Sequence, residues 1–226
     1  FSDVFDRNQL QTTTRDPTEM LQSRLELYDG KTHIQAQWLQ SERDDYYLFR
    51  RLRDGVTNIK LEHYVISAKH ELELDADKEI TLAAGWQEAE RDSITALVPQ
   101  GEAPFENVDF LFGEYFKYES FNLSADGLWS VNEELTVNYG LSYTESQVPG
   151  GFLQSNFDIF GDFSQFDQVT LFNKPEQRVV LDKTRTISSL YLQGQWQLNT
   201  KLKVTGGLRY DKYNDVDNEL MPRLAA

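Results

Sequence analysis

Apolar and polar residues alternate along the chain in segments that each read as two strands joined by a tight turn. The clearest segment runs from Ser188 to Tyr213 and turns at Asn199-Thr200. A period of two residues is that of a β-strand, whose successive side chains point to opposite faces. The face we expect to be apolar carries Leu190, Leu192, Gly194, Trp196, Leu198, Leu202, Val204, Leu208 and Tyr210, and the polar face carries Gln193, Gln195, Lys203 and Arg209.

The same hairpin pattern occurs three more times upstream. These segments cover residues 21–38, 64–86 and 121–143, with turns at 28–31, 75–78 and 132–134. Repeated hairpins of this kind predict an all-β fold, an antiparallel meander of about 8–9 strands.

The connections are short at one end of the strands and long at the other end. Turns within hairpins have about two to four residues, the short class of hairpin loop. Longer, acidic connections join one hairpin to the next, at Ser41–Asn58, Gln87–Lys117, Glu145–Thr186 and, more briefly, Asn214–Glu219. Short turns at one rim and long loops at the other favour a transmembrane β-barrel. A soluble β-sandwich or lipocalin-like barrel is the alternative.

Aromatic residues stand near the strand ends on the apolar face. Such a distribution suits the interfacial girdle of a membrane barrel, although core aromatics of a soluble sheet would give the same pattern. The residues concerned are Trp38, Trp86, Trp129, Tyr143, Trp196 and Tyr210.

Composition agrees with this interpretation. The chain has 226 residues, no cysteine and a formal net charge of −15. Its mean hydropathy is −0.57, and no apolar run reaches the ~18 residues of a transmembrane helix. Phosphate binding requires clustered Lys and Arg, so the charge argues against nucleic acid as a partner. The single repeated pattern predicts one domain over residues 1–226, and we expect an internal piece of a longer barrel, because the chain stops within the apparent strand after Leu220.

The C-terminal hairpin resembles a known family. Ser188 to Tyr213 reads SSLYLQGQWQLNTKLKVTGGLRYDKY and is followed by Met221-Pro222-Arg223-Leu224. This order resembles the barrel of TonB-dependent outer-membrane receptors, in which a "GLRYD" strand precedes a "PRL" strand start. The resemblance is good over roughly the last 110 residues. An energy-coupling box, a plug domain and a terminal aromatic strand have no counterpart in the sequence.

The resemblance implies a bacterial outer-membrane location and part of a receptor for active nutrient uptake. Outer-membrane lipid and a small nutrient ligand, by family a ferric siderophore or similar chelate, would be its partners. The TonB energy-coupling complex would act through parts of a parent chain that are absent here. Two alternatives stay open: a passive or structural outer-membrane barrel, and a soluble secreted β-sheet binding module.

No catalytic site, metal site or cofactor is predicted, so we do not expect an enzyme. His33, His63 and His70 lack the paired spacing of metal ligands. No serine stands in a Gly-x-Ser-x-Gly elbow, which leaves an outer-membrane hydrolase as a weaker alternative. The acidic run Asp211, Asp215, Asp217 and Glu219 has oxygen ligands of the type that binds Ca²⁺. It lacks the turning glycine of an EF-hand, and a solvated loop is favoured.

Phenylalanines recur in the longest loop at 152, 157, 160, 163, 166 and 172. Four of them stand three residues apart, near the spacing of a helix face. Docking of the loop onto the barrel rim is favoured, and ligand binding is the alternative; its candidates are Phe157, Phe160, Phe163 and Phe166. On the polar face we expect Lys203, Arg209 and Asp211 to face the lumen, and we expect Lys203 and Arg209 to pair with carboxylates from neighbouring strands or from a plug.

Overall fold

The described residues fold mainly as β-strands, with one short 3-10 helix among them. The computed structural model describes residues 18–44, 56–98, 100–101 and 104–225. Its elements are β1 (Thr18–Tyr28), β2 (Thr32–Asp44), β3 (Asn58–Asp75), β4 (Lys78–Val98), β5 (Phe110–Ser130), β6 (Leu135–Val148), β7 (Gly151–Phe157), β8 (Gln165–Phe172), the 3-10 helix η2 (Pro175–Gln177), β9 (Lys183–Asn199), β10 (Leu202–Tyr213) and β11 (Glu219–Ala225). The predicted all-β class is confirmed.

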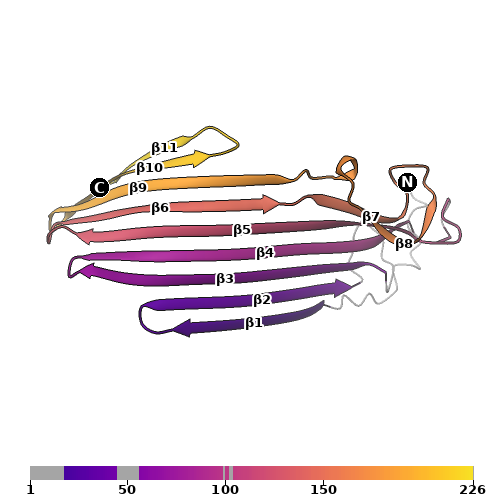
Figure 1. The fold of residues 1–226 in the computed structure, drawn as a ribbon, viewed down its shortest axis with the longest axis horizontal. Helices are drawn as coiled ribbons and strands as arrows, with labels where there is room; N and C mark the ends of the chain where they lie inside the picture. The colour runs from indigo at the N-terminus through magenta and orange to yellow at the C-terminus, as the bar shows by residue number, and fades with distance from the viewer. Residues whose placement is uncertain (1–17, 45–55, 99, 102–103, 226) are drawn as a thin grey trace.

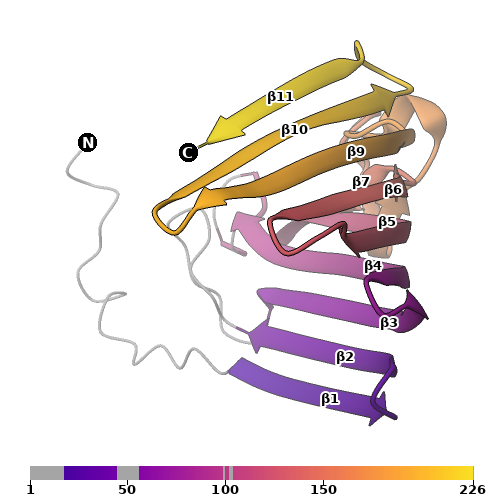
Figure 2. The same cartoon turned by 90° about the vertical axis from the view of Figure 1, so that its left-hand side faces the viewer.

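Nine strands form one antiparallel sheet in the order β1-β2-β3-β4-β5-β6-β9-β10-β11 (Figure 1). This order confirms the predicted meander. The remaining strands, β7 and β8, form a hairpin at the long-loop end, where β7 also pairs with the first residues of β5. Figure 2 shows that the sheet is curved and stays open between β1 and β11, which do not pair with each other in the described part of the chain.

Short turns close the hairpins at one end of the sheet, and side-chain amide or carboxylate oxygens hold three of them. Asn132 Oδ1 accepts hydrogen bonds from the backbone N–H groups of Glu134 and Leu135 at 2.9 and 2.8 Å. Asn199 and Asp29 repeat this arrangement in the turns after β9 and β1. Backbone hydrogen bonds, first from Thr32, lower the pKa of Asp29. The sequence predicts these turns correctly because Asn and Asp bond to the backbone two residues on.

At the other end the strands extend further than the alternation predicts. β4 continues to Val98 and β5 begins at Phe110, so most of the predicted loop Gln87–Lys117 is strand. The predicted loop Glu145–Thr186 contains the end of β6, the β7–β8 hairpin, η2 and the start of β9. Strand pairing continues here although the two-residue alternation stops, and the adjacent residues Thr95 and Ala96 of β4 are both buried, so both faces of the strand are covered in this stretch.

The two faces of the sheet carry the predicted side chains in a continuous register. Leu190 pairs with Leu141 on one neighbouring strand and with Tyr210 on the other. On this apolar face Leu141 and Leu190 are 58% and 61% exposed, whereas Ser189 and Asp211 on the polar face are 7% and 4% exposed. A sheet with its apolar face outward requires lipid or another apolar cover.

Aromatic residues lie on the apolar face at two levels. Toward the long-loop end, Trp38 stacks on Tyr64 with ring centroids 6.3 Å apart, and Trp86 pairs with Phe121. Toward the turns, Trp129 Nε1 donates a hydrogen bond of 3.0 Å to Asp77. Phe121 and Trp129 are ~26 Å apart along β5 at ~3.3 Å per residue, which is of the order of the ~25 Å apolar band of a membrane barrel.

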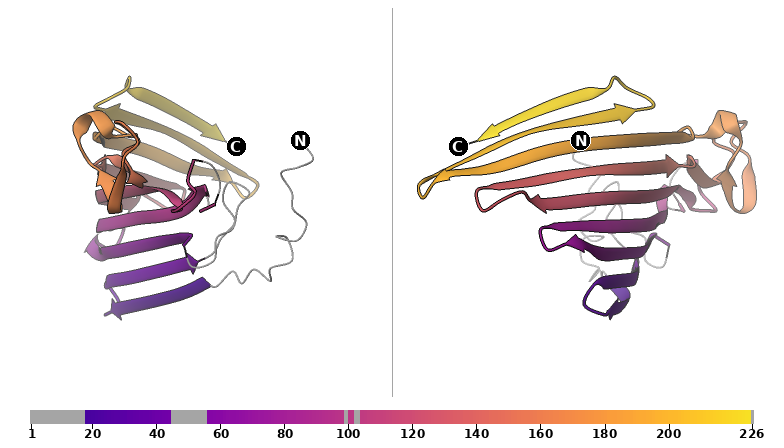
Figure 3. Two further views of the ribbon diagram at one scale, coloured as in Figure 1. Left: turned by 90° about the vertical axis from the view of Figure 1, so that its right-hand side faces the viewer. Right: turned by 60° about the vertical axis from the view of Figure 1, so that its left-hand side comes forward.

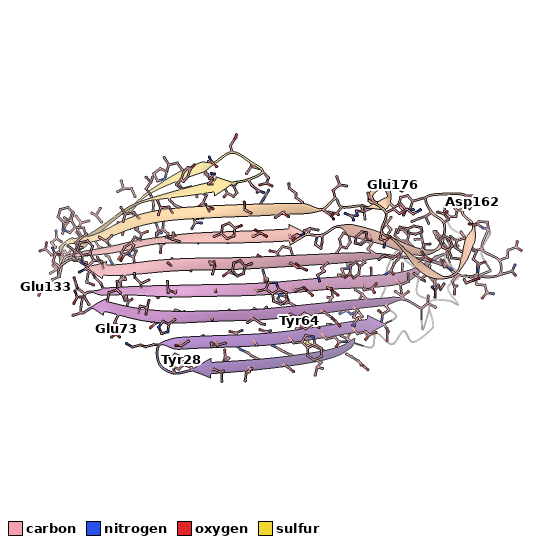
Figure 4. All side chains as sticks on the ribbon, viewed as in Figure 1. Tyr28, Tyr64, Glu73, Glu133, Asp162 and Glu176 are labelled. Atoms are coloured by element: carbon pink, nitrogen blue, oxygen red, sulfur yellow. The ribbon has the colours of Figure 1, made fainter. Side chains whose placement is uncertain are left out.

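Carboxylates lie at both ends of the sheet, and ion pairs such as Lys117–Glu88 and Arg209–Asp211 lie within the strands. Figure 4 shows Glu73 and Glu133 at the short-turn end, and Asp162 and Glu176 at the opposite end. The buried apolar side chains of the described residues also lie at the long-loop end: Ala96, Phe110, Phe157 and Phe172. The described part of the chain contains no helix of a length and hydropathy suited to crossing a bilayer.

Candidate functional site

The β7–β8 hairpin is fixed to the end of the sheet by buried polar side chains. Asn156 Oδ1 accepts from the backbone N–H of Leu111, and its Nδ2 donates to the backbone carbonyl of Asp109, both at 2.8 Å. Ser155, fully buried, donates to the carbonyl of Leu111 at 2.7 Å. These bonds satisfy backbone N–H and C=O groups of β5 and its approach that the pairing of β5 with β7 leaves without a partner. The hairpin, seen curled at the end of the sheet in Figure 3, is therefore a docked element.

Four phenylalanines, two from the hairpin and two from the start of β5 and the connection before it, form a cluster that we call the aromatic cap: Phe105, Phe110, Phe157 and Phe163. Phe105 stacks on Phe110 at 4.9 Å and meets Phe157 edge-on at 5.0 Å. Phe163 approaches Phe110 at 5.8 Å. Edge-to-face and offset pairs at such distances are the favourable geometries of aromatic rings.

Phe163 adopts an uncommon backbone conformation, with φ of 63°. A bulky residue in the left-handed region costs of the order of 1–3 kcal/mol. The turn supports this conformation, because the Phe163 N–H donates to the carbonyl of Asp158 at 3.1 Å. The result is that the Phe163 ring lies against the cap while half of the side chain stays exposed, at 50%.

Beside the aromatic cap lies a hollow of about 410 Å³, here called the cap hollow. Its walls combine apolar rings with a carboxylate and two amides, which suits a ligand having both a flat apolar part and polar groups. The lining residues are Pro104, Phe105, Glu106, Asn107, Val108, Phe157, Phe163 and Gln165.

The structure divides the four candidate phenylalanines into two pairs. Phe157 and Phe163 line the cap hollow. Phe160 and Phe166 instead lie against Phe172, at 5.2 and 6.2 Å between ring centroids. The three-residue spacing belongs to a hairpin and its turn, not to a helix face. Docking accounts for the buried Phe157, and ligand binding by the exposed rings stays a prediction.

Sequence analysis missed Phe105, Glu106 and Phe110 as members of this region. Phe110 begins β5 and Phe105 lies in the connection before it, so both precede the candidate segment by more than forty residues. Only the pairing of β7 with β5 brings the two segments together. The one local signal was the density of phenylalanine between 105 and 116.

On the polar face, a tyrosine crosses one strand to reach the next. The Tyr191 hydroxyl on β9 donates to Asp126 Oδ1 on β5 at 2.8 Å, and Ser124 donates to the other carboxylate oxygen at 2.9 Å. The intervening strand, β6, presents Gly140 at this position. A Cβ there would lie 2.6 Å from the Tyr191 ring, so glycine leaves the room that the ring needs.

Arg209 and Asp211 share the polar face, as the register predicts. Arg209 Nε donates to both Asp211 oxygens at 2.9 and 3.1 Å, and Nη2 donates to Ser189 Oγ at 3.0 Å. The carboxylate partner thus comes from the same strand, two residues on, and not from a neighbouring strand as expected. Lys203 has the same parity on β10, opposite Gln197. That this face lines a lumen stays a prediction.

Within the acidic run 211–219, Asp211 pairs with Arg209 and Asp215 pairs with cations of β9. Asp215 is bonded by Arg185 at 2.9 Å and approached by Lys183 at 3.2 Å. The hydrogen bonds from Arg185 lower the pKa of the Asp215 carboxyl. Among the residues that the structure describes, no three carboxylate or imidazole groups come together as metal ligands would. Two of the histidines contact other partners: His70 lies 2.9 Å from Thr32 Oγ1 and His33 lies 3.6 Å from Glu26.

Comparison with known proteins gives a family match over almost the whole chain. The family model described as "TonB dependent receptor-like, beta-barrel" matches residues 2–226. No curated protein matches the chain. The family and the solved structures that the fold resembles are receptors and transporters, not enzymes.

Three solved structures illustrate the likeness. They are the siderophore receptor PirA from Acinetobacter baumannii, with a TM-score of 0.56 and 14% identity, a mutant of the ferric enterobactin receptor PfeA from Pseudomonas aeruginosa, with 0.54 and 13%, and the RagAB peptide transporter, with 0.55 and 11%. Each match covers 92% of this chain and 30% of the other. At such identities the likeness shows the fold, and the chain spans about a third of these structures.

Proposed function

This chain belongs to the TonB-dependent receptor-like β-barrel family, and from that membership we propose that it forms part of the wall of a receptor that imports a scarce nutrient. The family is located in the bacterial outer membrane. The observation that supports the proposal most directly is the inverted sheet, with Leu141 and Leu190 exposed and Asp211 buried. Such a wall separates lipid from a polar interior.

Uptake against a concentration gradient needs an energy source outside this chain. We propose that the TonB complex supplies it through other parts of the full protein, since the chain covers 30% of the receptors it resembles. Uptake should therefore stop in a host that lacks TonB. Continued uptake there would identify a passive diffusion barrel instead. Folding of the chain without detergent or lipid would favour the soluble binding module.

We place ligand contact at the cap hollow. Exposed aromatic surface with Glu106 and Gln165 nearby suits a compact ligand with aromatic or other flat groups, such as a ferric siderophore or a similar chelate. The structures with a similar fold are named for siderophores and for peptides. The fold alone therefore does not identify the ligand, and the ligand has to be inferred from the chemistry of the cap hollow.

The test uses the complete gene product in detergent, titrated with a panel of ferric catecholate and hydroxamate chelates. Phe163→Asn removes the ring from the hollow and keeps a residue that tolerates positive φ. Loss of one ring contact should weaken binding by about tenfold. Phe160→Asn is the matched control, because Phe160 has a similar exposure of 48% and lies against Phe172 outside the hollow.

Equal effects of the two substitutions, or none, would remove the cap hollow as the ligand site. Energy dependence is measured separately, by uptake of radiolabelled ferric chelate with and without TonB. The location of the ligand and the transport function therefore fail or hold independently.

A further inference from the structure

The apolar face of the sheet contains a hollow over β1 to β4, which we call the girdle hollow. Its volume is about 510 Å³. Two neighbouring rows of paired residues enclose it: Trp38 pairs with Tyr64 in one row, and Ala36 pairs with Ile66 in the next. The apolar side chains that line the hollow are Leu25, Ala36, Trp38, Tyr64, Ile66 and Trp86.

Ala36 keeps the floor of the hollow low, while larger side chains stand around it. Ala36 pairs with Leu25 on one side and with Ile66 on the other, and these two side chains are 60% and 54% exposed. Trp38 and Tyr64 close the long-loop side as a flat wall, because their rings stack at 6.3 Å with planes 10° apart. The hollow is therefore a trough with apolar sides, which a flexible hydrocarbon chain can fill with close contacts.

A step from aromatic to acidic residues marks the end of the apolar band just above this hollow. On each of β3 to β6, an outward aromatic residue is followed by a glutamate two residues closer to the long loops; the pairs are Tyr64 and Glu62, Trp86 and Glu88, Phe121 and Glu119, and Tyr143 and Glu145. The Tyr64 and Tyr143 hydroxyls donate to their glutamates at 3.2 and 2.7 Å. Aromatic rings of this kind lie at the level of the lipid headgroups. The girdle hollow therefore lies just inside the bilayer on the long-loop side, which in a membrane barrel is the extracellular side.

The polar rim above the hollow offers an excess of hydrogen-bond acceptors. The charged outward groups on β2 to β5 within four residues of the aromatic row are Glu42, Lys60, Glu62, Glu88, Glu90, Lys117 and Glu119. Lys60 pairs with Glu62, and Lys117 lies between 3.0 and 3.5 Å from the other three carboxylates of β4 and β5. Arg24 borders the hollow, but its guanidinium lies on the opposite face of the sheet with Glu26 and Gln35. The rim therefore has five carboxylates against two lysines that are both paired, and it attracts hydrogen-bond donors more than phosphates.

We propose that the girdle hollow binds one acyl chain of an outer-leaflet glycolipid, whose sugar hydroxyls donate hydrogen bonds to the carboxylates above it. The bilayer supplies the chain, because the apolar face meets lipid at this level. Sugar hydroxyls suit the rim, because they donate to carboxylate oxygens without the repulsion that a phosphate meets there. The bound lipid has a fixed place on the barrel, unlike the lipid that covers the rest of the apolar face. This inference needs the apolar face to meet the bilayer, and it does not depend on the nutrient or on the cap hollow.

The experiment uses the complete gene product, purified in detergent, and counts bound lipids by native mass spectrometry. Two probes with the same acyl chains are titrated, a monoglucosyl diacylglycerol and a phosphatidylglycerol. Ala36→Trp is the test variant, because the indole fills the floor of the hollow. Ala125→Trp is the matched control, because Ala125 faces outward between Leu82 and Leu141 and lies outside the hollow.

We expect Ala36→Trp to weaken binding of the glucosyl lipid about tenfold and Ala125→Trp to leave it unchanged. The unsubstituted protein should bind the glucosyl lipid more tightly than phosphatidylglycerol, because the carboxylates of the rim repel the phosphate. Ala36→Leu and Ala125→Leu repeat the comparison with a smaller side chain, so that a folding defect in one tryptophan variant does not decide the result. The proposal is overturned if substitutions at the two positions have equal effects, or if phosphatidylglycerol binds as tightly as the glucosyl lipid.

Discussion

The spanning sheet exposes its large apolar side chains to its surroundings, whereas the cap region buries them within the protein. In the sheet, Leu141 and Leu190 are 58% and 61% exposed, while in the cap region Phe157 and Phe172 are 7% and 4% exposed. The sheet therefore depends on a bilayer to remove its apolar surface from water. The cap region, which lies beyond that level, has a small core of its own. A single strand such as β5 therefore lies partly in lipid and partly in water.

This difference assigns distinct tasks to the two regions. The sheet gains from strand pairing and from lipid, so its outward side chains tolerate variation in shape more than in polarity. The cap gains from ring packing and from the bonds of Asn156 and Ser155, so its side chains should tolerate little change in shape. Substitutions that change the shape of a cap side chain, or the polarity of an outward side chain of the sheet, therefore test this comparison.

The largest expected effect follows from truncation of a cap phenylalanine. Phe157→Ala should destabilise the β7–β8 hairpin by about 3–5 kcal/mol, the usual cost of removing a buried ring. Hydrogen exchange of the amides in β7 and β8 measures the loss, and the spanning strands should keep their protection. Phe160→Ala serves as the control for a half-exposed ring. Loss of protection throughout β9 and β10 would show that the cap and the sheet do not differ as described.

A charge on the outward face should have the next largest effect. Leu192→Arg is expected to destabilise the folded barrel by ~2–4 kcal/mol, because the side chain would enter the apolar band. Gln193→Arg, one residue along on the polar face, should change stability little. Urea unfolding of the complete gene product in lipid vesicles measures both. Equal costs at the two positions would contradict the assignment of the faces.

Steric room on the polar face predicts a smaller effect. Gly140→Ala would bring a Cβ to 2.6 Å from the Tyr191 ring and 2.9 Å from the Ala125 carbonyl, and overpacking of this kind costs about 1–3 kcal/mol. Gly206→Ala is matched in chemistry and has open space around its Cβ, so we expect almost no change. The same unfolding experiment compares them, and a similar response would mean that Tyr191 is free to move aside.

The smallest effect concerns pH at the loop after β10. The pKa of Asp215 is lowered by hydrogen bonds from Arg185. A carboxyl with a lowered pKa contributes stability above its unfolded value of ~3.9, and loses it as pH falls further through the folded value. Hydrogen exchange of residues 214–218 should therefore rise only below about pH 4. In Arg185→Gln the rise on acidification should be smaller, because the pKa of folded Asp215 then lies nearer its unfolded value; an unchanged profile would show that the pair contributes nothing.

The sequence predicts the spanning sheet better than its ends. Two-residue alternation gives the faces, and Asn132, Asn199 and Asp29 mark the turns that the structure shows. Beyond Trp86 the alternation stops although β4 continues to Val98. The pattern reflects a contrast between one apolar and one polar face, and that contrast is lost where adjacent residues such as Thr95 and Ala96 are both buried.

The candidate sites depended more on long-range pairing. A spacing of three among Phe157, Phe160 and Phe163 suggested a helix face, yet these residues belong to a strand end and the turn that follows it. The ring partners Phe105 and Phe110 lie in another segment. Arg209 was correctly placed on the polar face, but its contact with Ser189 required the register of β9 and β10.

What the sequence determined by itself is the local order: which residues alternate, where the chain turns, and which face of each strand is apolar. Only the tertiary structure decided which strands meet, and with that the contact of Tyr191 with Asp126 across Gly140, sixty-five residues apart in the chain. The physical reason is that alternation and turn formation are short-range effects, fixed by side-chain direction and backbone bonding over a few residues. Contacts across a sheet arise from the order in which strands pair, and no local pattern records that order.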